Sequence, residues 1–131
     1  MQIVTDSGTD VNFDAHEMAE FGVHVVPLSV SLEGKSYREG IDIRPDEFYT
    51  MLDGTHSLPV TSQPPAGEFA ALYRKLAETD PDILSIHISA GLSGTADSAR
   101  AGAEMVPEAK VTVIDTKTLS VPSGWQVEAA A

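Results

Sequence analysis

Short β-prone runs alternate with helical segments along most of this chain, and this alternation limits the folds that it can adopt. The clearest unit is an apolar run at 83–88, followed by a turn rich in hydroxyls and glycine at 89–95 and by an Ala- and Gly-rich helix over roughly 96–106. Strands separated by helices form βαβ units with parallel strands and right-handed crossovers. We therefore predict an α/β fold with a mostly parallel sheet flanked by helices.

The other elements follow from the spacing of apolar residues. The strongest helix signal lies after residue 67, where Phe69, Leu72, Tyr73 and Leu76 are spaced as on one helical face. The proline-rich segment 58–67 is predicted to be a loop. The remaining predicted strands cover 3–5, 24–32 (with Pro27 at an edge or bulge) and 111–114, and the remaining predicted helices cover 12–21, 45–52 and 121–131.

Length, charge and the lack of cysteine exclude several classes of protein. With 131 residues the chain fits one domain, and 42% hydrophobic residues suffice for a soluble globular core. The 8 Lys and Arg are scattered among 20 Asp and Glu, for a net charge of −12, which argues against nucleic-acid and anionic-membrane partners. No apolar run is long enough to span a bilayer. The absence of cysteine excludes disulfides and agrees with a cytoplasmic location.

Four polar segments share a composition rich in Ser, Thr, Asp and Gly. They cover 5–9, 61–64, 89–95 and 115–120, and three of them directly follow predicted strands. In a parallel sheet such turns gather at the carboxyl edge, where α/β folds bind ligands. Hydroxyls, free backbone N–H groups and a helix N-terminus form an anion site without Lys or Arg. We expect a ligand with a small anionic head group, although each turn by itself also has the composition of an ordinary helix cap.

No catalytic motif in the sequence is complete. Ser93 follows a strand as a hydrolase nucleophile would, but Thr95 occupies the last glycine position of G-x-S-x-G and all four histidines precede the serine. His87 lies within an apolar strand, so we expect a buried, hydrogen-bonded histidine. Carboxylates near strand ends leave one alternative open, a Mg²⁺-dependent phosphotransferase or hydrolase that uses Asp6, Asp10 and Asp115.

The polar segments also carry a resemblance to a known family. V-T-D-S at 4–7, T-S-Q-P at 61–64 and G-L-S-G-T at 91–95 occur in the order and spacing of the DegV family, and the likeness covers essentially the whole chain. Two departures stand out. Pro65 replaces the family's usual Ser or Ala, and Val121 to Trp125 occupy the place of its glycine-spaced M-G-x-G segment.

The resemblance implies a bacterial, cytoplasmic fatty-acid-binding protein with no catalytic activity and no cofactor. In that family two α/β domains enclose the acyl chain of a long-chain fatty acid, and the protein presents the carboxylate to a fatty acid kinase for phospholipid synthesis. Residues 1–131 would then be the N-terminal domain, with the second domain absent. Without that domain an apolar patch would be exposed, and the isolated domain would self-associate.

The resemblance also implies site residues. Thr61 and Ser93 are expected to bind the fatty-acid carboxylate, with the neighbouring Ser62 and Gly94 contributing backbone groups. We expect three further residues at the pocket edge, namely Asp6, Ser7 and Thr95.

Overall fold

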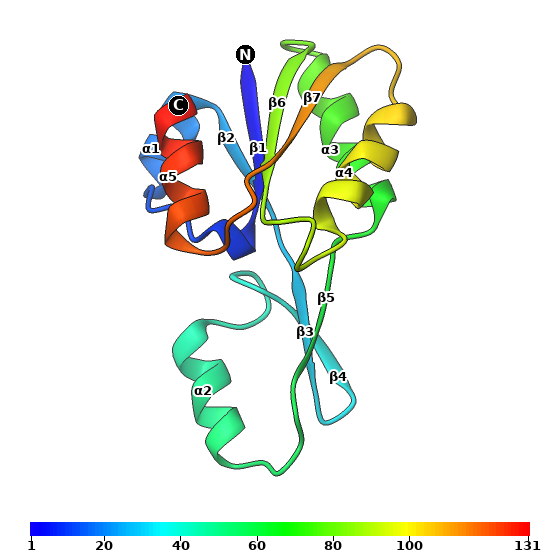
Figure 1. Cartoon of the computed structure of the whole chain (residues 1–131). Helices are drawn as coiled ribbons and strands as arrows, with labels where there is room; N and C mark the ends of the chain where they lie inside the picture. Colours follow the sequence, from blue (N-terminus) through cyan, green and yellow to red (C-terminus); the bar gives the residue numbers. More distant parts are fainter.

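A four-stranded parallel sheet lies at the centre of the larger of two layers of elements in the computed structural model, which describes all residues from 1 to 131 (Figure 1). The strand order is β2-β1-β6-β7, so the first strand along the chain lies inside the sheet. This confirms the predicted α/β class. The strands are β1 (Gln2–Asp6), β2 (Val23–Val26), β6 (Asp82–His87) and β7 (Lys110–Asp115).

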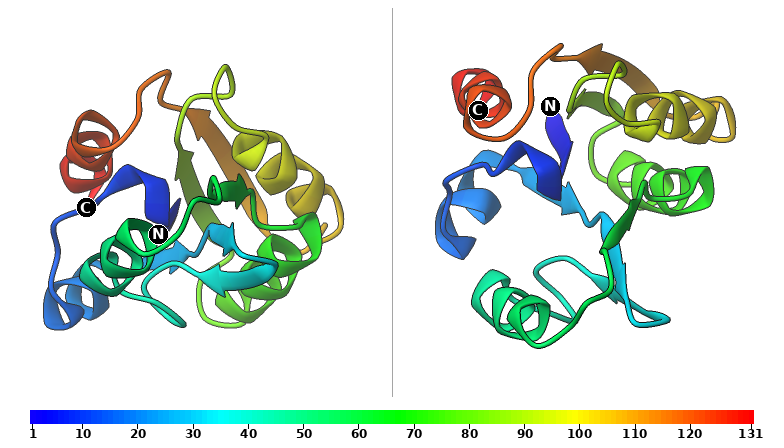
Figure 2. Two further views of the ribbon diagram at one scale, coloured as in Figure 1. Left: turned by 90° about the horizontal axis from the view of Figure 1, so that it is seen from below. Right: turned by 60° about the horizontal axis from the view of Figure 1, so that its bottom comes forward.

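Helices cover both faces of this sheet (Figures 1 and 2). One face carries α1 (Ala15–Phe21) and α5 (Val121–Ala130), and the other carries α3 (Ala66–Ala77) and α4 (Thr95–Glu104). A 3₁₀ turn, η1 (Ser7–Thr9), follows β1. The helix starts and stops have local causes, since Pro45 stands in the first turn of α2 (Pro45–Asp53) and Gly22 ends α1 at φ 65°.

A second, smaller sheet lies beyond the carboxyl ends of the parallel strands, together with α2 (Figure 1). It is antiparallel, with strand order β4-β3-β5. The chain enters it from β2 and returns from β5 into α3. Its strands are β3 (Ser29–Leu32), β4 (Lys35–Arg38) and β5 (Val60–Ser62).

Two sequence-based predictions are wrong in this smaller sheet. The predicted strand 24–32 is two strands in different sheets, because Pro27 lacks the N–H that a continuous ladder needs and the chain leaves the parallel sheet there. The predicted loop 58–67 contains β5, whose residues Val60 to Ser62 pair with β3. All three β5 residues are exposed, so the sequence shows no alternation of buried apolar and exposed polar residues that would predict a strand there.

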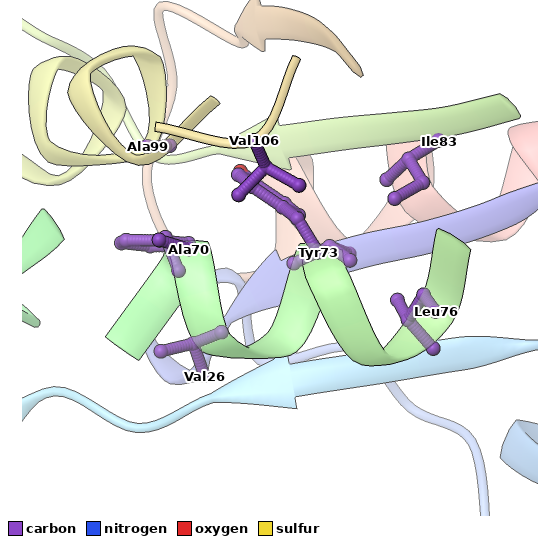
Figure 3. Close-up of a cluster of buried hydrophobic side chains, with 9 residues drawn as sticks. Val26, Ala70, Tyr73, Leu76, Ile83, Ala99 and Val106 are labelled. Carbon is purple, nitrogen blue, oxygen red and sulfur yellow. The ribbon is translucent and has the colours of Figure 1, made fainter. Parts of the chain in front are cut away.

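The hydrophobic core is divided between the two faces of the parallel sheet. Figure 3 shows the larger cluster, to which α3 contributes Tyr73 and Leu76, and to which the sheet and α4 contribute further side chains. Alternation along β1 sends Val4 into this cluster and Ile3 into the opposite one, beneath α5. Trp125 does not join either cluster. It is 62% exposed.

We predict that Gly102→Ala destabilises the fold, because α3 and α4 approach closely at this residue. A Cβ at Gly102 would lie 2.7 Å from Cβ of Phe69 and 2.8 Å from the backbone oxygen of Ala66. Overpacking of this kind lowers the unfolding free energy by about 1–3 kcal/mol. This loss is larger than the gain from the better helix propensity of alanine. Urea unfolding should show a lower midpoint.

Gly67→Ala is the matched control, since a Cβ there meets nothing within 4 Å. It should leave the urea midpoint unchanged or raise it, because alanine favours the helix. Equal midpoints for the two variants would contradict the close packing of α3 on α4.

Candidate functional site

A pocket of about 460 Å³ lies where the carboxyl edge of the parallel sheet meets the antiparallel sheet. We call it the junction pocket. It receives residues from the η1 turn, from the loop between β6 and α4, from the segment after β7 and from β5. Its lining residues are Gly8, Leu28, Glu39, Thr61, Ser62, Gln63, Ile88, Leu92, Ser93, Gly94 and Leu119.

The four residues expected to bind the ligand all line this pocket. Thr61 and Ser62 come from β5, while Ser93 and Gly94 precede α4. Parallel pairing of β1 with β6 brings the turn before α4 to the edge of the sheet, and antiparallel pairing of β5 with β3 brings Thr61 to the same place. The three residues expected at the pocket edge lie around the pocket, and none of them is among its lining residues.

Ser93 forms a hydrogen bond with the first residue of α4 and also lines the pocket. Its Oγ accepts a hydrogen bond from the backbone N–H of Thr95 at 3.3 Å, and the two hydroxyl oxygens lie 2.8 Å apart. Thr95 is fully buried, whereas Ser93 is half-buried. The contact with Thr95 therefore fixes the Ser93 hydroxyl at the pocket wall.

Gly94 leaves room for the Gln63 side chain at the start of α4. A Cβ at Gly94 would lie 2.7 Å from Nε2 of Gln63, so a side chain there would push Gln63 away. Gln63 follows β5 directly in the chain. The absence of a side chain at Gly94 thus lets the end of the Gln63 side chain lie at the pocket wall.

Ser7 connects three segments beside the junction pocket. Its Oγ accepts a hydrogen bond from the backbone N–H of Leu28 at 2.9 Å and donates one to Oε2 of Glu39 at 2.7 Å. Leu28 joins β2 to β3, and Glu39 follows β4. Ser7 therefore ties the η1 turn to the antiparallel sheet and holds the Glu39 carboxylate in place.

Asp6 lies beneath the site as part of a fully buried polar chain. Its Oδ2 lies 2.8 Å from Nδ1 of His87, whose Nε2 lies 2.7 Å from Oγ of Ser85. The hydroxyl of Tyr73 continues the chain at 2.7 Å from the same Oγ. This confirms the prediction of a buried, hydrogen-bonded histidine.

The Asp6 carboxylate also accepts hydrogen bonds from two backbone N–H groups next to it. Gly8 donates to Oδ1 at 3.0 Å, and Ile88 donates to Oδ2 at 3.2 Å. Both donors belong to residues that line the junction pocket. Asp6 thus positions pocket residues from below, and its own side chain is 0% exposed.

The alternative metal site is not formed, because the structure does not gather its three carboxylates. No group of three or more His, Cys, Asp or Glu side chains is placed to hold a metal ion. Asp6 faces His87, while Asp10 accepts a 2.6 Å hydrogen bond from the hydroxyl of Ser120. Asp115 accepts from the backbone N–H groups of Lys117 and Ala90, which hold its pKa below its usual range.

Several lining residues could not be found from the sequence. Glu39 lies in a polar segment whose pattern gives no sign of a site, and Leu28 lay inside a strand predicted to be continuous. Leu92 and Leu119, which are 68% and 48% exposed, add apolar surface at the pocket. A signal for these two was present, because both lie within the polar turns that were expected to converge.

No helix is both long and apolar enough to cross a membrane.

Comparisons with known proteins point to one family. The family model named DegV matches residues 1–131. A DegV domain-containing 15.5 kDa protein of Staphylococcus aureus is 41% identical over 127 residues, covering 96% of this chain and 87% of that protein. Other curated relatives from this species are also 41% identical, but this chain spans only 44% of their length.

Two solved structures share the fold over nearly the whole chain. A DegV family protein from Thermus thermophilus, described in terms of fatty acid binding, is 40% identical with a TM-score of 0.87 and covers 98% of this chain. DegV of Bacillus subtilis, described as a fatty acid binding protein, is 34% identical with a TM-score of 0.89 and covers 96%. The chain spans 45% and 44% of these two proteins.

We predict that the buried polar chain makes stability fall at high pH. Burial raises the pKa of Tyr73 to about 12 from 10.0, although the hydrogen bond with Ser85 acts in the opposite direction. The folded protein therefore favours the neutral phenol. The neutral phenol makes its full contribution to the unfolding free energy below about pH 10. As the pH rises towards 12, the unfolding free energy falls by up to about 2–3 kcal/mol.

Urea unfolding at a series of pH values between those limits, for the wild type and Tyr73→Phe, measures this contribution. The wild type should lose more unfolding free energy than the variant over the range, because only the wild type carries the phenol. Parallel curves for the two proteins would contradict the burial of an ionisable Tyr73.

Proposed function

Because this chain belongs to the DegV family, we propose that it binds a long-chain fatty acid and holds the carboxylate in the junction pocket. The observation that carries this proposal is the convergence of Thr61 and Ser62 of β5 with Ser93 and Gly94 of the loop before α4 on one pocket. The fatty acid binding described for the Thermus and Bacillus relatives supports the choice of ligand.

The head group meets hydroxyl and backbone donors in this arrangement. In this proposal the hydroxyls of Thr61 and Ser93 donate to the carboxylate oxygens, and the backbone N–H groups of Ser62 and Gly94 are further donors. The first turn of α4 adds the positive end of a helix dipole. A hydrogen bond to a charged group contributes about 1.5–3 kcal/mol, so the head group sets the position and chemical identity of the ligand.

The acyl chain supplies most of the affinity. Each buried CH₂ contributes about 0.8 kcal/mol, so a long chain outweighs the polar contacts of its head. Four apolar residues line the same pocket and are placed to meet the carbons next to the carboxylate, namely Leu28, Ile88, Leu92 and Leu119.

We further propose that the chain acts in the cytoplasm as a carrier without catalytic activity of its own. A second domain would close the junction pocket, shield the exposed Leu92 and Leu119, and complete a tunnel for the acyl chain. A fatty acid kinase would then act on the presented carboxylate. Without a second domain the same apolar surface would favour self-association of the chain.

We predict that Ser93→Ala and Thr61→Val each weaken fatty-acid binding by about ten- to a hundredfold, the effect of losing one hydrogen bond to a charged group. The measurement combines lipid extraction and mass spectrometry of the purified intact protein with titration of hexadecanoate into the delipidated protein. Each variant removes one hydroxyl from the pocket and leaves the apolar lining in place.

Ser36→Ala and Thr112→Val are matched controls, because these side chains lie on β4 and β7 and do not line the junction pocket. They should bind hexadecanoate as the wild type does. Wild-type affinity in the Ser93 and Thr61 variants would remove these residues from the site. A wild-type protein that neither carries nor binds fatty acid would overturn the proposed function.

A further inference from the structure

The junction pocket carries one charge, and it is negative. Glu39 is the only ionisable side chain among the lining residues, which include no Lys, Arg or His. An anionic head group placed beside Thr61 and Ser93 therefore shares the pocket with a carboxylate of the protein. Repulsion between like charges grows in proportion to the charge on the ligand.

Glu39 is held where it is by both its backbone and its side chain. Its backbone N–H donates to the oxygen of Leu28 at 2.9 Å, and its Oε2 accepts the 2.7 Å hydrogen bond from Ser7. The backbone N–H of Leu28 in turn donates to Oγ of Ser7. This closed set of contacts, together with the half-buried position of Glu39, fixes the carboxylate at the pocket wall.

The charged groups around Glu39 leave it without an ion pair. No salt bridge includes Glu39, while Arg38, the residue before it, pairs with Asp42 through two hydrogen bonds. Arg44 shares with Glu39 a second pocket of about 300 Å³, between α2 and the antiparallel sheet, and is not within salt-bridge distance of it. On the opposite side Asp6 faces His87.

Asp10 completes the surroundings of Glu39. Both carboxylates line a third pocket, which has no basic residue among its lining, and Asp10 is bonded to Ser120 rather than to a cation. The local field at Glu39 is therefore negative on this side as well. Because no salt bridge includes Glu39, its charge is not neutralised by a direct ion pair within this chain.

We propose that Glu39 sets the charge selectivity of the junction pocket. Its carboxylate tolerates a head group with a single negative charge and disfavours head groups with two, such as a phosphate monoester on the same alkyl chain. This inference rests on the proposed fatty-acid function and adds to it a residue that selects between ligand classes. The hydroxyls of Thr61 and Ser93 do not make this distinction, since they donate equally well to phosphate oxygens.

Glu39→Gln in the intact protein tests this selectivity. The amide oxygen of glutamine can still accept the Ser7 hydrogen bond, so the variant removes the charge and keeps the shape. The affinities of hexadecanoate and hexadecyl phosphate are measured at about pH 8, where a phosphate monoester with a second pKa near 6 is doubly charged. Glu104→Gln, at the exposed end of α4 and outside the pocket, controls for the change in net charge.

The wild type and Glu104→Gln should prefer hexadecanoate, and Glu39→Gln should reduce this preference by about tenfold or more, mainly through tighter binding of the phosphate. A preference in Glu39→Gln equal to that of the wild type would overturn the inference and leave the proposed function intact. A wild type that binds hexadecyl phosphate more tightly than hexadecanoate would also overturn the inference and leave the proposed function intact. Failure of the wild type to bind either ligand would overturn the proposed function and this inference together.

The salt dependence of the wild type gives a second test that needs no variant. Exposed and half-buried charges are screened as ionic strength rises, so the preference for hexadecanoate should shrink between about 0.05 M and 0.5 M salt. A preference that does not change with salt would indicate selection by shape and would contradict the role of the Glu39 charge.

Discussion

The parallel pairing of β1 with β6 is the constraint on which the rest of the molecule depends. It places Asp6 and His87 at neighbouring strand ends, and their 2.8 Å contact closes a buried polar chain that reaches α3 through Ser85 and Tyr73. Buried polar groups are costly unless they are paired, and no buried side-chain nitrogen or oxygen in this structure lacks a hydrogen-bond partner. The carboxyl edge of the sheet is therefore a rigid base on which the polar turns are built.

The sequence predicts most of this arrangement and misses one part for an identifiable reason. Hydrophobic runs and glycine-rich turns predict the parallel strands, the helices between them and the convergence of the turns at 5–9, 89–95 and 115–120. Residues 61–64 reach the same place by another route, through the antiparallel sheet. The exposed strand β5 has no hydrophobic signature, and its partner β3 is separated from β2 only by Pro27 and Leu28.

The residues of the site also differ in whether the sequence could predict their positions. Ser93 and Gly94 could be placed near the sheet edge from the turn that contains them, whereas the position of Thr61 beside them followed from the family resemblance and not from local pattern. Glu39 could not be found by either route, because its place depends on hydrogen bonds among residues 7, 28 and 39 that are distant in the sequence. The result is a pocket lined by hydroxyl groups and by one carboxylate.

The central claim is that the backbone and hydroxyl groups before α4 and in β5 bind a carboxylate. The most direct measurement is an NMR titration of the isotope-labelled intact protein with hexadecanoate and, separately, with hexadecanol, which has the same chain and no charge. The account predicts that the amide signals of Ser62 and Gly94 shift strongly with the acid and weakly with the alcohol. Equal shifts with both ligands, or binding of the acid that leaves these two amides unmoved, would contradict it.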